Sequence, residues 1–162
     1  MTTNKLYNSA QMEKEDLVLV GFVAAAHAWQ LGAAATEVAV LRRKHKISPP
    51  TTDGPPDFIR ALRAQQNGLE FGVMFEVILW TAGIFGHQVP AAALGCYYLV
   101  ARHFYVKGYI QDAEKRKAPF YHSVRAVKGL LAVSLLGMGN IVLRNYANVD
   151  VVSMLKVKFF PA

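Results

Sequence analysis

Three polar residues with helical spacing could together hold a charged, peptide-like ligand. Arg63, Asn67 and Glu70 stand at i, i+4 and i+7, so on an α-helix they form one stripe. They supply a guanidinium fork, an amide that donates and accepts, and a carboxylate. This set suits a zwitterionic ligand with carboxylates and an amine. It suits equally well an intrahelical Arg63–Glu70 pair beside an Asn67 bonded to another helix, and the pattern leaves both interpretations open.

Two further groups follow later in the chain. Tyr105 and Tyr109 are four residues apart, which puts two phenols on one helical face; an interfacial aromatic belt is the simpler interpretation of such a pair. The run 115–117 (Lys-Arg-Lys) has the composition of a solvated basic patch. The isolated polar residues of the apolar segments show no metal-ligand spacing, so we predict no metal site and expect each to be satisfied within a helical bundle: His27, Glu37, Glu76, His87 and His103.

The composition indicates what kind of surface surrounds these residues. The 162 residues suffice for one domain, and 53% are hydrophobic while only 18% are charged, against about a quarter charged in soluble domains. Much of the surface therefore does not face water. The net charge of +7 comes from short basic clusters between apolar stretches, which disfavours nucleic acid and favours loops beside a membrane or an anionic ligand. The single cysteine, Cys96, excludes an intrachain disulfide, and we expect it to be buried.

Four apolar segments predict an all-α integral membrane protein, an antiparallel bundle of four helices. The segments are 17–41, 68–86, 89–106 and 129–143, and a bilayer crossing takes about 20 residues. Their polar residues are tolerable inside a bundle, and their small residues let helices approach closely. We assign 1–16 as a polar N-terminal extension without the features of a signal peptide, 17–146 as the helical domain and 147–162 as a tail. A soluble bundle would need charged helix faces, and 77–85 offers none.

The connections predict how the segments are arranged. Only a few residues before Pro90 join the second and third segments, which requires a tight hairpin. The first connection, 48–56, is rich in proline and cannot be helical, and Asp57 after it is a candidate helix cap. With four spans, the first and third connections share one side. Their basic clusters, 42–46 and 115–117, place that side in the cytosol.

Several motifs, in order, resemble the membrane-associated proteins in eicosanoid and glutathione metabolism (the MAPEG family). They extend over roughly 41–121 and are SPP at 48–50, GPPDF at 54–58, RAQ at 63–65 before Asn67 and Glu70, WTAG at 80–83 and RHFYVKGY at 102–109. The first segment is similar to the family only in character, and the last segment and tail hardly at all. Within the family, the chain is most similar to the branch that joins glutathione to leukotriene A4.

The resemblance implies a homotrimer in the endoplasmic reticulum and nuclear envelope, with one glutathione bound between adjacent subunits near the cytosolic side. Seven residues would contact glutathione, with Arg42 and Gln65 coming from the neighbouring subunit: Arg42, Arg63, Gln65, Asn67, Glu70, Tyr105 and Tyr109. The catalytic arginine of the family corresponds to Arg116, and an auxiliary arginine to Arg43. Phe71 stands where a tyrosine of the family touches glutathione, and Gly68 where a cysteine is usual.

The implied chemistry is conjugation of the co-substrate glutathione to a lipid epoxide such as leukotriene A4. A guanidinium held against the sulfur favours the thiolate, the reactive form, and cannot itself take up the proton. Arg43 would assist at the alkoxide that forms, and a peroxidase activity on lipid hydroperoxides is left open.

Two alternatives stay open. QVPAA at 88–92 and VKGY at 106–109 resemble a non-enzymatic branch of the family that binds and presents arachidonate-like lipid. That branch lacks an arginine at the position of Arg116, so Arg116 together with Arg63, Asn67 and Glu70 favours the enzyme. A structural membrane subunit without a small ligand is the third interpretation, and it predicts no saturable binding of glutathione.

Overall fold

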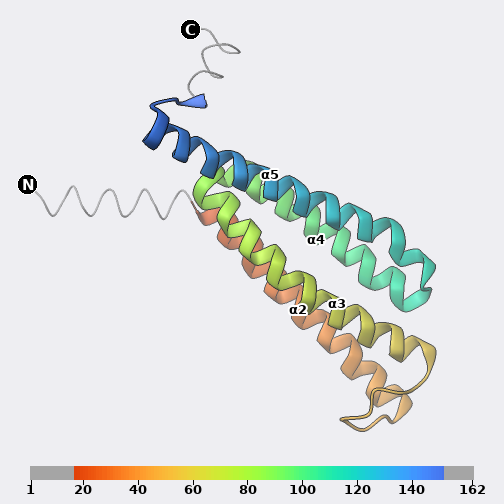
Figure 1. Ribbon diagram of the computed structural model, residues 1–162. Coiled ribbons are helices and arrows are strands. Elements are labelled where there is room, and N and C mark those ends of the chain that lie inside the picture. The colour runs from red at the N-terminus through yellow and green to blue at the C-terminus, as the bar shows by residue number, and fades with distance from the viewer. Residues whose placement is uncertain (1–16, 152–162) are drawn as a thin grey trace, which may run out of the picture.

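Four long helices form the described part of the protein, as the sequence predicted. The computed structural model describes residues 17–151. The helices are α2 (Val18–His45), α3 (Pro56–Thr81), α4 (Gln88–Gln111) and α5 (Lys117–Ala147). A π-helical turn, η1 (Ala82–Gly86), follows α3, and a 3₁₀ turn, η2 (Glu114–Arg116), precedes α5. Figure 1 shows two antiparallel hairpins, α2–α3 and α4–α5, which lie together where α3 passes into α4 and diverge toward the opposite end.

Three of the four helical segments are long and apolar enough to cross a membrane. They are Val18–His45, Pro56–Gly86 and Glu114–Ala147. Helix α4, which carries Arg102, His103 and Lys107, is not among them. Residues 17–151 are therefore all-helical with three candidate spans, and a fourth crossing by α4 remains a prediction.

The helices continue beyond the predicted apolar segments at one end of the bundle. α2 runs through the basic cluster to His45, and α3 begins at Pro56, well before Gly68. The predicted cap at Asp57 was wrong, because Pro55 holds the N-cap position and Asp57 lies in the first helical turn. Its carboxylate instead accepts hydrogen bonds from Lys44 Nζ (3.1 Å) and pairs with His45 Nε2 (2.9 Å). Asp57 thereby ties the start of α3 to the end of α2.

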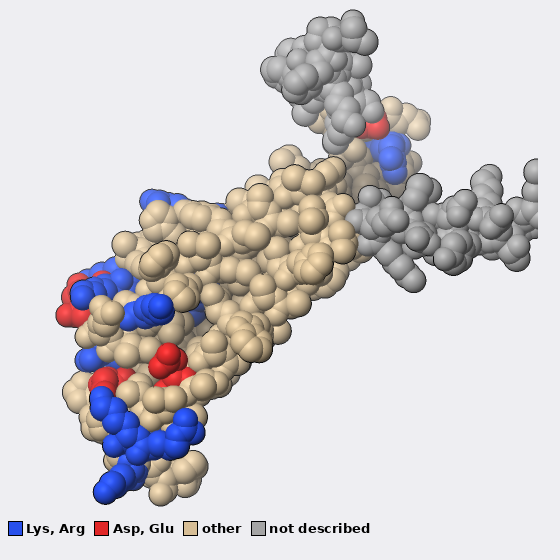
Figure 2. Space-filling view, turned by 180° about the vertical axis from the view of Figure 1, so that it is seen from behind, with Lys and Arg blue, Asp and Glu red and all other residues tan. Residues whose placement is uncertain are grey.

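Both long connections lie at the end where the hairpins diverge (Figure 1). In Figure 2 most of the charged side chains on the face shown gather at this end, and a broad uncharged surface lies beyond them. Large apolar side chains are exposed along the helices, Trp29 at 82% exposure among them. An exposed apolar surface of this extent is expected where lipid or another chain, not water, is the neighbour. The extension 1–16 and the tail beyond 151 lie outside the described residues.

The core draws on all four helices, and aromatic rings from α2, α3 and α4 pack together within it. Phe75 lies on Tyr98 with 3.8 Å between ring centroids, and His27 meets Phe75 edge-on at 4.8 Å. His27 is only 2% exposed and its Nδ1 is hydrogen-bonded to Glu76 Oε1 at 2.7 Å. His27 and Glu76 are thus satisfied within the bundle, as predicted. The expectation for Cys96 was wrong, because its side chain is exposed on α4.

A close approach of backbones fixes α5 against η1. Gly137 packs directly on the backbone of Phe85 and Gly86, so a Cβ at this position would overlap the Phe85 carbonyl group. A Cβ at Gly139, two residues further along α5, would meet no atom within 4 Å. Small residues at such contacts are what allow membrane helices to pack closely.

We expect Gly137→Ala to lower the free energy of unfolding by about 2 kcal/mol, because the backbones must separate. The matched Gly139→Ala should be neutral or stabilising by up to about 1 kcal/mol, since alanine favours helix over glycine. Thermal unfolding of both variants in one detergent, followed by circular dichroism, measures the difference. Equal melting temperatures for the two variants would contradict the close contact.

Candidate functional site

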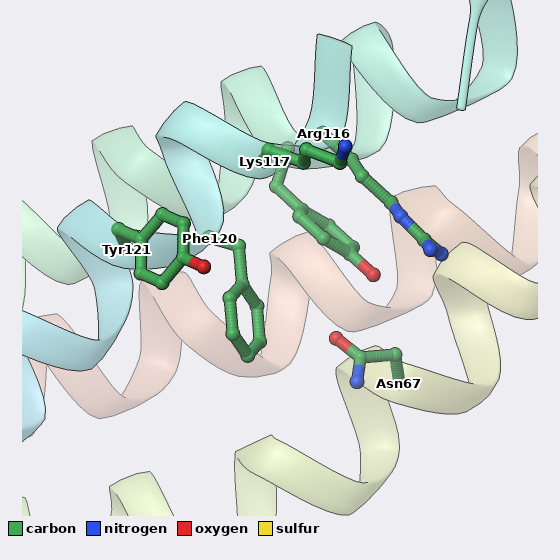
Figure 3. Close-up of a pocket in the computed structure, with 6 residues that line it drawn as sticks. Asn67, Arg116, Lys117, Phe120 and Tyr121 are labelled. Atoms are coloured by element: carbon green, nitrogen blue, oxygen red, sulfur yellow. The ribbon is translucent and has the colours of Figure 1, made fainter. Parts of the chain in front are cut away.

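A cavity of about 300 Å³ opens between the two hairpins at the charged end of the molecule. Helices α3, α4 and α5 and the turn η2 contribute its lining residues, which are Asn67, Tyr105, Arg116, Lys117, Phe120 and Tyr121. Figure 3 shows Arg116 and Asn67 reaching toward the same space from opposite sides, with the ring of Phe120 beside them. The cavity thus combines a guanidinium, an amide and a phenol with apolar rings.

Arg116 owes its position to the short turn between α4 and α5. The chain leaves α4 at Gln111, and the 3₁₀ turn η2 carries Arg116 back over the last turn of that helix. Its guanidinium carbon lies 4.3 Å from the centroid of the Tyr109 ring. A cation over an aromatic face is attracted to it, so Tyr109 helps to hold Arg116 at the cavity.

Tyr105 lines the cavity, whereas Tyr109 packs against Arg116 without lining it. Their ring centroids are 5.8 Å apart, and Tyr105 is only 3% exposed, with the Phe120 ring 6.2 Å away. An aromatic belt exposed to lipid therefore does not describe Tyr105. The structure places it inside the bundle, with its side chain on the cavity.

The three residues of the polar stripe on α3 do not share one environment. Asn67 points to α4, where its Oδ1 accepts a hydrogen bond from Arg102 Nη1 at 2.9 Å. Arg63 and Glu70 are exposed, and Arg63 Nη1 donates to Gln66 Oε1 at 3.3 Å. Arg63 and Glu70 form no ion pair with each other, so that part of the structural alternative is absent from the described chain. The interhelical bond of Asn67 does form.

Arg102 is a central residue that the prediction of site residues omitted. It is 3% exposed, and its guanidinium lies 4.2 Å from the Tyr105 ring centroid and 5.8 Å from that of Phe71. Among residues 17–151, no carboxylate pairs with it, and its Nη2 has no hydrogen-bond partner. Arg102 therefore supports Asn67 and Tyr105 from behind the cavity. A lone arginine in an apolar segment was the available signal, because such residues are costly there and are usually functional.

The structure does not bring Arg42, Arg43 and Gln65 to this cavity. Arg42 Nη1 donates to the Thr51 carbonyl oxygen at 2.8 Å, and its guanidinium lies 4.9 Å from the Phe58 ring centroid. Arg42 and Arg43 line a separate depression at the end of α2. The resemblance assigns Arg42 and Gln65 to the site of a neighbouring subunit, and a single chain leaves that assignment a prediction.

Three other lining residues were also missed: Lys117, Phe120 and Tyr121. Lys117 belongs to the basic run 115–117 and pairs with Glu114. Phe120 and Tyr121 follow Pro119 in the first turns of α5, where no spacing distinguished them from other apolar residues of the helix.

The arrangement is suited to binding an anionic group beside an apolar one. Arg116 and Lys117 supply positive charge, Asn67 and Tyr105 supply directed hydrogen bonds, and Phe120 supplies apolar surface. Charge-assisted hydrogen bonds of this kind are about twice as strong as neutral ones. Within the part of the chain that the structure describes, no group of three His, Cys, Asp or Glu residues could hold a metal ion.

Comparisons with known proteins identify the same family as the motifs, and they extend the similarity beyond 41–121 to the first segment and part of the last, where little was expected. The MAPEG family model matches residues 19–136. Microsomal glutathione S-transferase 2 of Mus musculus is 42% identical over 132 residues, 82% of this chain and 85% of that protein; that of Homo sapiens is 36% identical over 142 residues, 88% and 97%. Leukotriene C4 synthase of Bos taurus is 46% identical over 102 residues, 63% and 68%. The chain belongs to the MAPEG family.

Proposed function

We propose that this protein is a membrane glutathione transferase that conjugates glutathione to a lipid epoxide of the leukotriene A4 type. The observation that carries the proposal is the meeting of Arg116, Tyr105 and Asn67 around one cavity at the charged end of an apolar bundle. Relatives that cover most of the chain are named as glutathione transferases, and others as leukotriene C4 synthase.

The chemistry proceeds through the thiolate of glutathione. Arg116 lies against the sulfur, lowers the pKa of the thiol and remains charged throughout. Asn67 and Tyr105 donate hydrogen bonds that orient the tripeptide, and the apolar rings beside them admit the lipid. The thiol proton passes to water, the thiolate attacks an epoxide carbon, the carbon–oxygen bond breaks, and the alkoxide takes a proton from water. Arg43 of an adjacent subunit stabilises that alkoxide.

In this proposal the protein works as a homotrimer with four spans per chain. Arg63 and Glu70 are exposed in the single chain although they share the stripe of Asn67. A neighbouring subunit that contributes Arg42 and Gln65 closes the site over them. The charged end faces the cytosol, because its basic clusters follow the positive-inside rule, and the membrane is that of the endoplasmic reticulum and nuclear envelope.

We expect Arg63→Ala and Glu70→Ala each to raise the KM for glutathione about tenfold or more, because each removes a charge-assisted hydrogen bond to the ligand. The melting temperature should stay unchanged, since both side chains are exposed and not paired with each other. Met74→Ala is the control, because Met74 is exposed on the same helix and does not line the cavity. An unchanged KM in both charge variants would contradict their place in the site.

The reaction is tested with purified, detergent-solubilised protein. Glutathione conjugation is measured with leukotriene A4 methyl ester and with a generic aryl halide, and lipid hydroperoxide reduction is measured in parallel. Turnover of the epoxide supports the proposal. No turnover with saturable arachidonate binding intact would instead identify a lipid-presenting scaffold, and no saturable glutathione binding would leave a structural subunit.

A further inference from the structure

Glu76 presents a carboxylate to the outer surface of the bundle, deep in its apolar part. It lies in a groove of about 610 Å³ between α2 and α3, whose other lining residues apart from His27 are apolar, Ala24, Ala28 and Gly72 among them. The hydrogen bond from His27 holds the carboxylate in place, yet its side chain remains 30% exposed. A carboxylate facing hydrocarbon costs about 2.5–3.5 kcal/mol, so this position favours a partner of opposite charge.

Lys128 is a cation in the same situation on α5. Its side chain is exposed, and within residues 17–151 it forms no ion pair. Exposed Tyr121, Leu131 and Leu135 flank it on the outer side of the helix. The surface around Lys128 is therefore an apolar helix face with a positive charge at its centre.

Contacts between α3 and α5 place the two charges at the same depth. Both helices run away from the charged end (Figure 1). Near the far end Thr81 Oγ1 and Ser134 Oγ are 3.2 Å apart, and near the charged end Asn67 and Phe120 line one cavity. Glu76 precedes Thr81 on α3 by as many residues as Gly129 precedes Ser134 on α5, so Glu76 and Gly129 lie at the same level. Lys128 is the residue before Gly129, and one residue of an α-helix corresponds to an axial rise of about 1.5 Å.

We propose that a second copy of this chain covers the groove, with its α5 lying between α2 and α3 and its Lys128 paired with Glu76. Depth and charge match, although the two side chains belong to different faces of one chain and do not meet within it. The small residues of the groove allow a helix to approach closely. Because the contact joins two different surfaces, it repeats head to tail, and in the proposed homotrimer the repeat closes into a ring. The inference rests on the proposed homo-oligomer and names a contact that fixes it.

Charge reversal tests the pair. Lys128→Glu and Glu76→Lys should each weaken association about tenfold or more in native mass spectrometry from mild detergent, and the double variant should restore the oligomer. Arg144→Glu is the matched control, since Arg144 is an exposed cation on the same helix near its other end. Circular dichroism of each variant checks that the helices form.

A disulfide provides a second readout that does not depend on charge. In a Cys96→Ser background, the double variant Glu76→Cys with Lys128→Cys should yield oligomers whose chains are covalently linked on oxidation. Either cysteine alone should not link all chains of the oligomer. If the wild type is monomeric, the proposed homo-oligomer fails as well. If the wild type is oligomeric, yet both charge reversals leave it intact and the cysteine pair does not link chains, this inference alone is overturned.

Discussion

Replacing Arg116 with alanine is expected to lower kcat for glutathione conjugation by about a hundredfold to a thousandfold, the size of effect seen when a group that stabilises reaction charge is removed. The reason is electrostatic. At neutral pH free glutathione is mostly thiol, and the proposed role of Arg116 is to favour the thiolate. Its position against Tyr109 and at the cavity supports that role. The KM for glutathione should change less than kcat, because other residues bind the rest of the tripeptide.

The ultraviolet absorbance of the bound thiolate provides a direct measurement. It should be present when glutathione binds the wild type and lost in Arg116→Ala. The pH of half-maximal activity should move upward in the variant, toward the pKa of the thiol in free glutathione. Lys115→Ala is the control, because Lys115 belongs to the same basic run, is exposed and bonds to Gln111 outside the cavity. A thiolate signal that persists in Arg116→Ala would show that another group activates the sulfur.

The sequence predicted the helices well because length and composition decide them. An apolar segment of bilayer length can be satisfied only as a helix, and Pro90 with its few preceding residues left room for a hairpin alone. The helix ends were harder. Counting apolar residues stops at the membrane boundary, but arginine, lysine and glutamine are good helix formers, so α3 starts at Pro56 and α2 continues through the basic cluster to His45.

Single residues were predicted less well because their surroundings come from distant parts of the chain. Spacing grouped Arg63, Asn67 and Glu70, yet only Asn67 turns toward α4, and its partner Arg102 lies on another helix. Cys96 was expected to be buried because cysteine usually is in water-soluble proteins. In an apolar bundle the outer surface is also apolar, so that preference carries little information.

Arg102 is the residue of the site whose burial is energetically most costly, and this makes its role testable. Its charge is buried without a carboxylate partner among the described residues, and one of its nitrogens has no hydrogen-bond acceptor. Such a charge is expensive to bury. Only the hydrogen bond to Asn67 and the attraction to the rings of Tyr105 and Phe71 offset this cost of burial. An arginine kept for stability would be expected to have a better partner, so we interpret it as a positioning residue for the ligand site.

Arg102→Met is therefore expected to separate binding from stability. The KM for glutathione should rise by about tenfold to a hundredfold, because Asn67 loses the bond that directs its amide into the cavity and Tyr105 loses the cation behind its ring. The free energy of unfolding should change by only about 1 kcal/mol, since relief of the buried charge offsets the unpaired Asn67 carbonyl. Glutathione kinetics and thermal unfolding on the same preparation give both numbers.

Two variants decide between positioning and structural roles. Arg102→Lys keeps the charge but not the fork of donors, so it should recover part of the glutathione affinity. His103→Met, at the exposed neighbouring position on α4, should alter neither KM nor melting temperature. If Arg102→Met instead lowered the melting temperature steeply and left the KM of the folded protein unchanged, Arg102 would have a structural role. The positions of Asn67 and Tyr105 at the cavity would then depend on other contacts.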